Sequence, residues 1–133
     1  MIFVDSNIPM YLVGADHPNK RAARLRLEQA VIENEPLLTD AEVLQELLHR
    51  YTAIDRRDAI GPAWEAIVGV VDVIHPIELE DVTRARRLVG ATPTLSARDA
   101  VHLAVMQRRG ISRILTFDAG FDGIVGIERI GAD

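Results

Sequence analysis

The stretch SARDAVHLAVMQRRGISRILTFDAGFD, residues 96–122, contains a helix, a turn and a strand in immediate succession. Apolar residues crowd the segment 96–108, which predicts a buried helix, and Gly110 is placed to end it. SRILTF at 112–117 then predicts a strand, and Asp118 follows where the apolar run stops. A helix that leads directly into a buried strand is the repeating unit of α/β folds, so this stretch predicts that class.

The rest of the chain repeats the same alternation. Further strands are predicted at 2–4, 36–39, 70–77 and 126–130, and further helices at 7–13, 18–34, 41–54, 57–68 and 78–89. Asp40 is a plausible cap for the helix that follows it, and Gly90 should end the helix over 78–89. Strands separated by helices imply right-handed crossovers, so we predict a mainly parallel sheet with helices on both faces, in one domain spanning 1–133.

Composition limits the classes of protein to consider. A chain of 133 residues with 48% hydrophobic content is long enough to bury a core and too apolar to be disordered. The absence of cysteine excludes disulfides, thiolate zinc sites and cysteine nucleophiles. Neither an export signal nor a membrane-spanning run is visible, so the cytoplasm is the expected compartment.

The charge is unusual for a protein that would bind nucleic acid. A net charge of −5 argues against tight unassisted binding to a duplex. However, the basic residues are arginines apart from Lys20, and the arginine fork fits phosphate well. They form three clusters, which could contact phosphate or simply solvate helix faces: Arg21, Arg24 and Arg26; Arg84, Arg86 and Arg87; Arg108, Arg109 and Arg113.

Acidic residues stand at the predicted ends of strands and starts of helices. Asp5 and Asp118 directly follow two strands, while Glu46 and Asp99 lie on helices that cross back over the sheet. The carboxyl ends of parallel strands share one edge, where open α/β sheets place their ligands. We therefore expect these carboxylates to converge on one hard-cation site, with Asp122 close by.

Electrostatics explains why such a cluster would need a cation. Two carboxylates about 5 Å apart repel by about 3 kcal/mol at an effective dielectric near 20, so four cannot all stay ionised without compensation. Oxygen-only ligands favour Mg²⁺ or Mn²⁺, whereas zinc would call for closely spaced histidine or cysteine. An ion of this kind suits attack of water on a phosphodiester, and Thr116 could add a hydroxyl.

Each acid also has a purely structural interpretation. Asp99 stands three residues after Ser96, as in a capping box, and Asp5 could cap the helix over 7–13. Asp118 and Asp122 could be turn residues only.

Two further assignments stay open on the sequence alone. Glu42 lies one helical turn before Glu46 and is the alternative to it, although Glu46 is embedded among leucines. His102 lies close to Asp99 along the same helix, and a core or supporting role is favoured over a catalytic one.

Taken in order, four motifs resemble a PIN domain of the VapC type, the toxins of toxin–antitoxin pairs. They are IFVD at 2–5, LQEL at 44–47, SARDAVHLA at 96–104 and LTFDAGFD at 115–122. The resemblance covers nearly the whole chain and implies a three-layer α/β/α sandwich with a five-stranded parallel sheet. It also implies a homodimeric endoribonuclease that depends on Mg²⁺ or Mn²⁺ and is inhibited by a VapB-like antitoxin, whose tail enters the active groove.

Carried over to this sequence, the acidic quartet of the family falls on Asp5, Glu46, Asp99 and Asp118. Asp5, Asp99 and Asp118 would hold the ion, and Glu46 would position or activate the water. Thr116, Asp122 and Glu42 are the supporting positions.

Two other functions compete with the nuclease on the sequence alone. A catalytically silent PIN-like module that binds RNA or protein remains an alternative, although a complete set of acids speaks against it. An aspartyl phosphatase or phosphoacceptor fits badly, because Asn7 stands where such phosphatases have a second Asp and no lysine lies near the last strand. Glycine-rich phosphate loops are also missing.

Overall fold

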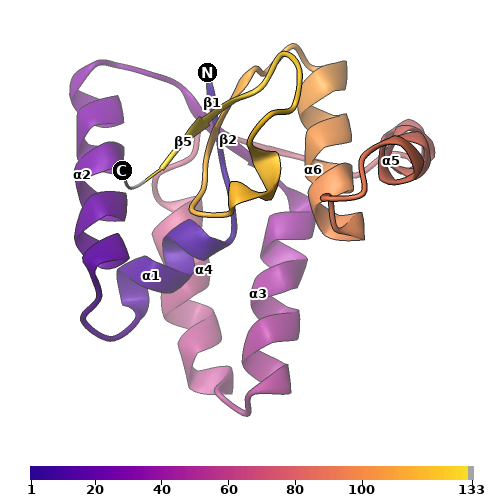
Figure 1. Ribbon diagram of the computed structural model, residues 1–133. Helices are drawn as coiled ribbons and strands as arrows, with labels where there is room; N and C mark the ends of the chain where they lie inside the picture. The colour runs from indigo at the N-terminus through magenta and orange to yellow at the C-terminus, as the bar shows by residue number, and fades with distance from the viewer. Residues whose placement is uncertain (132–133) are drawn as a thin grey trace.

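The computed structural model describes residues 1–131 and contains a sheet of five parallel strands in the order β3-β2-β1-β4-β5 (Figure 1). The strands are β1 (Ile2–Val4), β2 (Leu37–Asp40), β3 (Val73–His75), β4 (Arg113–Leu115) and β5 (Glu128–Ile130). The predicted α/β class and parallel sheet are confirmed. Strand β1 lies at the centre, because both of its neighbours pair with it, and its Phe3 and Val4 are fully buried.

Six α-helices and two 3₁₀ turns connect the strands. They are α1 (Asn7–Val13), α2 (Pro18–Ile32), α3 (Ala41–Ala53), η1 (Arg57–Ala59), α4 (Ile60–Val68), α5 (Leu79–Ala91), α6 (Ala97–Arg108) and η2 (Ala119–Phe121). Helix α1 packs against α2 and α4, whereas α6 packs against α3 and α5. Figure 1 shows α2 and α6 on opposite sides of the sheet, which makes three layers. Within residues 1–131, every helix is too short or too polar to cross a membrane.

The register of the central strands brings distant residues to one edge. Phe3 is aligned with Leu38 of β2 and Ile114 of β4, so these three strands end side by side. The residues that follow them therefore share the carboxyl edge of the sheet. Helices α1 and α3 begin at this edge, which is where the predicted site residues should lie.

Several predicted boundaries need correction. The strand predicted over 70–77 is limited to β3, because the amides of Val70 and Val71 donate to the carbonyl of Ile67 at the end of α4. Pro76 also lacks the N–H that a longer ladder would require. The helix predicted over 57–68 is divided into η1 and α4.

Gly90 does not end α5, contrary to the sequence prediction. The helix continues to Ala91, and the amide of Thr92 still donates to Leu88. Pro93 explains the actual end, because a residue that precedes proline is disfavoured in the helical region. Pro93 therefore determines the end of α5 more strongly than Gly90 does.

Asp81 joins α5 to α6 and is completely buried. Its carboxylate accepts hydrogen bonds from Arg108 Nη1 at 2.8 Å, from Arg109 Nη1 at 3.0 Å and from the amide of Glu78 at 2.8 Å. Burial by itself would raise the pKa of Asp81, but these donors outweigh it and hold the pKa below its usual value. Two arginines of the third cluster of the sequence, Arg108 and Arg109, therefore have a structural use in this helix pair.

Replacing Asp81 by alanine should destabilise the fold by about 2–4 kcal/mol, because it removes the cap of α5 and leaves two arginines without their buried partner. Urea unfolding followed by circular dichroism measures this. Asp58→Ala is the matched control, since Asp58 pairs with Arg56 at the surface, where ion pairs contribute little, and the substitution should have a much smaller effect. Because the folded-state pKa of Asp81 is depressed, the difference should be present above about pH 4 and shrink as the pH falls further. Equal effects of the two substitutions at neutral pH would contradict this account.

Candidate active site

Asp5 leaves the end of β1 and is fixed in place by its neighbours. Its amide donates to the carbonyl of Leu115 at 3.1 Å, so the backbone still follows the sheet. One carboxylate oxygen accepts from Thr116 Oγ1 and the other from the amide of Ser6, both at 2.7 Å. The residue is 3% exposed. Burial together with the charge of Glu46 raises the pKa of Asp5, although His102 and the hydrogen bonds oppose this.

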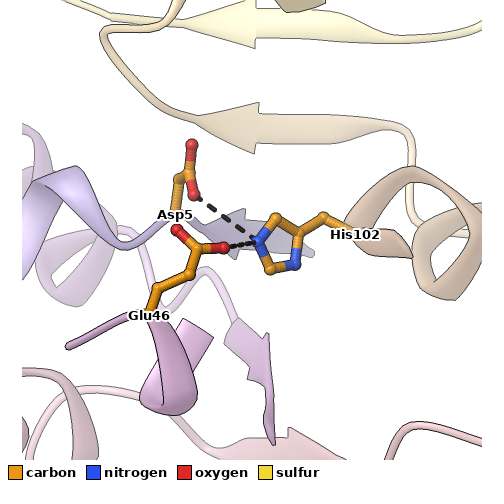
Figure 2. A group of neighbouring side chains, drawn as sticks. All are labelled: Asp5, Glu46 and His102. Atoms are coloured by element: carbon orange, nitrogen blue, oxygen red, sulfur yellow. Dashed lines mark hydrogen bonds and ion pairs between the residues drawn. The ribbon is translucent and has the colours of Figure 1, made fainter. Parts of the chain in front are cut away.

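Glu46 reaches the same place from the second turn of α3. Its Oε2 accepts from Ser6 Oγ at 2.6 Å, and its Oε1 lies 2.5 Å from His102 Nε2. Figure 2 shows the His102 ring in contact with Glu46 and facing Asp5, with 3.9 Å between Nε2 and Asp5 Oδ1. Burial would raise the pKa of Glu46, but the hydrogen bond and charge of His102 outweigh it and lower the pKa.

His102 is completely buried and carries hydrogen bonds on both ring nitrogens. Its Nδ1 lies 2.8 Å from Asp40 Oδ2, opposite the contact with Glu46. Burial disfavours a charged imidazole, yet Asp40, Glu46 and Asp5 together raise the pKa of His102 well above its ordinary value. Because ionised carboxylates only accept hydrogen bonds, the contacts on both ring nitrogens favour the protonated ring, which would donate on both sides and compensate the surrounding carboxylates.

Asp99 and Asp118 lie beside this buried group. Ser96 caps α6 by accepting from the amide of Asp99 at 3.1 Å, which leaves the Asp99 carboxylate available. Burial, the charge of Asp5 and a hydrogen bond with the Asp118 carboxyl raise the pKa of Asp99 to about 7. Asp118 is more exposed, and one of its oxygens accepts from the amide of Gly120 at 2.8 Å. The helix cap at Ser96 and the turn at Asp118 are thus both formed at the backbone, and the Asp99 carboxyl bonds with that of Asp118 in place of completing a capping box.

A hydrogen-bonded network links the ends of β1 and β4. Asn7 donates to Thr116 Oγ1 at 2.9 Å, and Thr116 in turn donates to Asp5. The amide of Asp118 also donates to Thr116 Oγ1 at 3.1 Å. Thr116 therefore holds Asp5 in one orientation while it places the start of the Asp118 loop.

The other two supporting positions, Asp122 and Glu42, each pair with an arginine and differ in how far they are buried. Asp122 is exposed and forms an ion pair with Arg129 at 2.7 Å. Glu42 is half-buried, lies 3.8 Å from Arg98 and has a pKa raised by burial and by the charges of Glu46 and Asp40. Among the described residues, the group whose ligand atoms lie within 4.8 Å of one another comprises Asp5, Glu46 and His102.

Sequence reasoning overlooked Ser6 and underestimated Asp40. Ser6 follows Asp5 directly, and its contact with Glu46 spans 40 residues. Asp40 was predicted only as a cap, which it is, since its Oδ1 accepts from the amide of Val43 at 2.9 Å. The rule that selected Asp5 and Asp118, an acid at the end of a buried strand, would also have selected Asp40.

The donor atoms fit a hard divalent cation. Asp5 and Glu46 place carboxylate oxygens within 4.8 Å of each other, with Asp99 and Asp118 beside them, and hard divalent cations prefer oxygen ligands. His102 Nε2 lies within the same group of possible ligand atoms, but it is engaged with Glu46 Oε1 at 2.5 Å. Burial and then repulsion between carboxylates raise the pKa of Asp5 and of Asp99, and a bound cation would offset the repulsion.

Comparison with known proteins agrees with this geometry. Residues 2–126 match the PIN domain family. The chain belongs to the PIN-domain family, in its VapC branch. The ribonuclease VapC13 of Mycobacterium tuberculosis is 58% identical over 130 residues, covering 98% of this PIN domain and 99% of the relative. Ribonuclease VapC23 of the same species is 46% identical over 118 residues, covering 89% of the chain and 93% of the relative.

Solved structures share the fold of this PIN domain. The M. tuberculosis toxin VapC20, described as cleaving the sarcin–ricin loop, superposes with a TM-score of 0.77 at 23% identity, covering 96% of this chain and 98% of that one. VapBC2 of Rickettsia felis, solved with a DNA fragment from its promoter, gives a TM-score of 0.74 at 15% identity over the whole of both chains. At these identities the likeness concerns the fold alone.

Adding millimolar Mg²⁺ or Mn²⁺ should raise the melting temperature of this domain, by about 4 °C at ten times the dissociation constant. Asp99→Asn should raise the melting temperature of the metal-free protein, because it removes one of the repelling charges, and should abolish most of the response to metal. Differential scanning calorimetry with and without the ion measures both effects.

Asp122→Asn provides the control for this experiment, because the Asp122 carboxylate is already paired with Arg129. It should keep the full response to the ion. If neither Mg²⁺ nor Mn²⁺ changed the melting temperature at concentrations up to about ten millimolar, the carboxylate oxygens would not form a cation site.

Proposed function

We propose that this chain is a divalent-cation-dependent endoribonuclease and the toxin of a VapBC-type pair. The observation that carries the proposal is the pair of carboxylates, Asp5 and Glu46, held rigidly at the carboxyl edge of the sheet with Asp99 and Asp118 beside them. The 58% identity to a protein named as a ribonuclease supports RNA as the substrate class.

Asp5, Asp99 and Asp118 would hold the cation in this proposal. When bound, Mg²⁺ or Mn²⁺ would offset charge on the phosphodiester and favour ionisation of the attacking water. Asp5 contributes a fixed orientation, because Thr116 and Ser6 occupy one lone pair on each of its oxygens and leave others for the ion. Asp99 and Asp118 complete the acidic rim from α6 and from the loop after β4.

Glu46 would position the water and accept its proton. Ser6 and His102 each hold one of its oxygens, which fixes the carboxylate in place. The same contacts keep the pKa of Glu46 low, so it is ionised and able to accept a hydrogen bond from water. His102 supplies the positive charge that makes an ionised Glu46 tolerable next to Asp5, and it acts as a positioning residue.

The partners follow from the relatives. Related folds have been solved as VapBC or toxin–antitoxin assemblies, which supports a VapB-like antitoxin as partner. We further propose a homodimer that acts on RNA in the cytoplasm. An antitoxin tail that brings a cation to the acidic edge would inhibit by occupying the place of the metal.

Replacing Asp5 by asparagine should reduce RNA cleavage at least about a hundredfold, because the substitution keeps the shape and removes a charge needed at the cation. Cleavage of total RNA in Mg²⁺, resolved by sequencing of new ends, measures this, and circular dichroism checks the fold. Glu42→Gln, which alters a carboxylate beside the site, should stay within about threefold of the parental rate. Parental activity in folded Asp5→Asn would refute the site, and an inactive parental protein that still binds RNA would favour the silent module.

A toxin of this kind should have a short open reading frame beside its gene, and co-expression of that reading frame with this chain should yield a complex without ribonuclease activity. The free protein should elute with twice the mass of one chain in size-exclusion chromatography coupled to light scattering. Purification of an active monomer that the neighbouring product neither binds nor inhibits would contradict the toxin assignment.

A further inference from the structure

A cavity of about 480 Å³ lies beside the acidic site and has no role in the chemistry described so far. Helix α1, the loop that follows it and the last turns of α3 form its walls. The main lining residues are Asn7, Met10, Tyr11, His17, Arg50 and Ile54. Asn7 connects the cavity to the acidic site. Its side-chain amide donates to Thr116, and Thr116 donates to Asp5.

Two helices lead from the acids into this cavity. Tyr11 follows Asn7 by one turn of α1, and Arg50 follows Glu46 by one turn of α3. One helical turn is about 5–6 Å, so the cavity begins within about one turn of the site on both walls. A nucleotide next to the cleaved phosphodiester would therefore be close enough to place its base in the cavity.

The aromatic rings of this cavity are held in place. Tyr11 packs edge-on against Phe117 with ring centroids 5.2 Å apart, and its centroid lies 5.0 Å from that of His17. His17 caps α2, since its Nδ1 accepts from the amide of Asn19 at 3.0 Å, which fixes the imidazole ring. Rigid aromatic surfaces lose little entropy when a flat ligand stacks on them.

Polar groups at the rim complete the cavity. Arg50 is exposed and forms no ion pair with any residue from 1 to 131, so its guanidinium is available for a phosphate or for stacking on a base. Asp16 lines the other side and can accept a hydrogen bond from an exocyclic amino group. Fixed aromatic rings, an arginine and a hydrogen-bond acceptor beside a phosphodiester site are the groups that bind unstacked bases of single-stranded RNA.

We propose that this cavity binds the base of a nucleotide adjacent to the cleaved phosphodiester, in single-stranded RNA, with the base stacked on Tyr11 and His17. The inference rests on the proposed ribonuclease function and adds how the substrate is held. It requires an unpaired nucleotide next to the cleavage position, because a base within a duplex cannot enter.

Binding of RNA can be measured without cleavage in an Asp99→Asn background. The probe is a 12-nucleotide single-stranded RNA of mixed sequence with a 5′ fluorescein, followed by fluorescence anisotropy. Tyr11→Leu removes the ring and keeps an apolar side chain, and it should weaken binding about tenfold. Tyr11→Phe keeps the ring and should bind like the background protein, as should His49→Leu, a change on α3 outside the cavity.

His17→Asn provides a second variant that does not depend on the packing of Tyr11. Asparagine is a strong helix cap, so α2 stays intact while the ring is lost, and binding should weaken about threefold or more. Photo-cross-linking of the same RNA with 5-iodouridine should label Tyr11 or His17, as identified by mass spectrometry.

Unchanged RNA binding by both Tyr11→Leu and His17→Asn would overturn the inference, as would an equal loss in Tyr11→Phe. Loss of antitoxin binding with intact RNA binding would assign the cavity to a protein side chain and overturn it as well. These results concern only the cavity if the parental chain cleaves RNA. If the parental chain neither bound nor cleaved RNA, the proposed ribonuclease function itself would be contradicted.

Discussion

The site depends on the buried ring of His102 and its contacts with carboxylates on both ring nitrogens. The ring lies between Asp40 on one side and Glu46 on the other, with Asp5 at 3.9 Å. Two like charges at about 4 Å repel by about 4 kcal/mol at an effective dielectric near 20, so Asp5 and Glu46 could not both ionise there without a cation. A protonated His102 would offset this repulsion from inside the protein, so the fold could tolerate the cluster of carboxylates without a bound metal ion.

The same contacts connect the site to the fold. Asp40 uses one oxygen to cap α3 and the other to hold His102, so the end of β2 is tied to α3 and α6 at once. Ser6 plays a similar part between the start of α1 and Glu46. Throughout residues 1–131, no buried side-chain nitrogen or oxygen lacks a hydrogen-bond partner. The acids are therefore held by the elements that build the sheet edge, and the geometry of the site is set by the fold.

How much the sequence predicts depends on the range of the interaction. The alternation of strands and helices predicts the parallel sheet, and an acid after a strand predicts that Asp5 and Asp118 reach its carboxyl edge. The contacts of His102 with Asp40 and Glu46 span 62 and 56 residues, and no local pattern contains them. Side-chain direction on a helix also decides which acid faces the site, which is why Glu42 and Glu46 could be ranked from the sequence only by their neighbours.

The distribution of charge limits how this protein can hold RNA. Arginines that looked like a phosphate-binding cluster are engaged elsewhere, since Arg108 and Arg109 bind Asp81 and Arg113 binds Glu35. With a net charge of −5 and acids gathered at the active edge, long-range attraction to a polyanion is weak. Under the proposed function, the ion then bridges protein and phosphate, and the remaining affinity must come from contacts that do not depend on net charge. Stacking of an unpaired base on a rigid aromatic surface is such a contact, and it would also favour single-stranded RNA over duplexes.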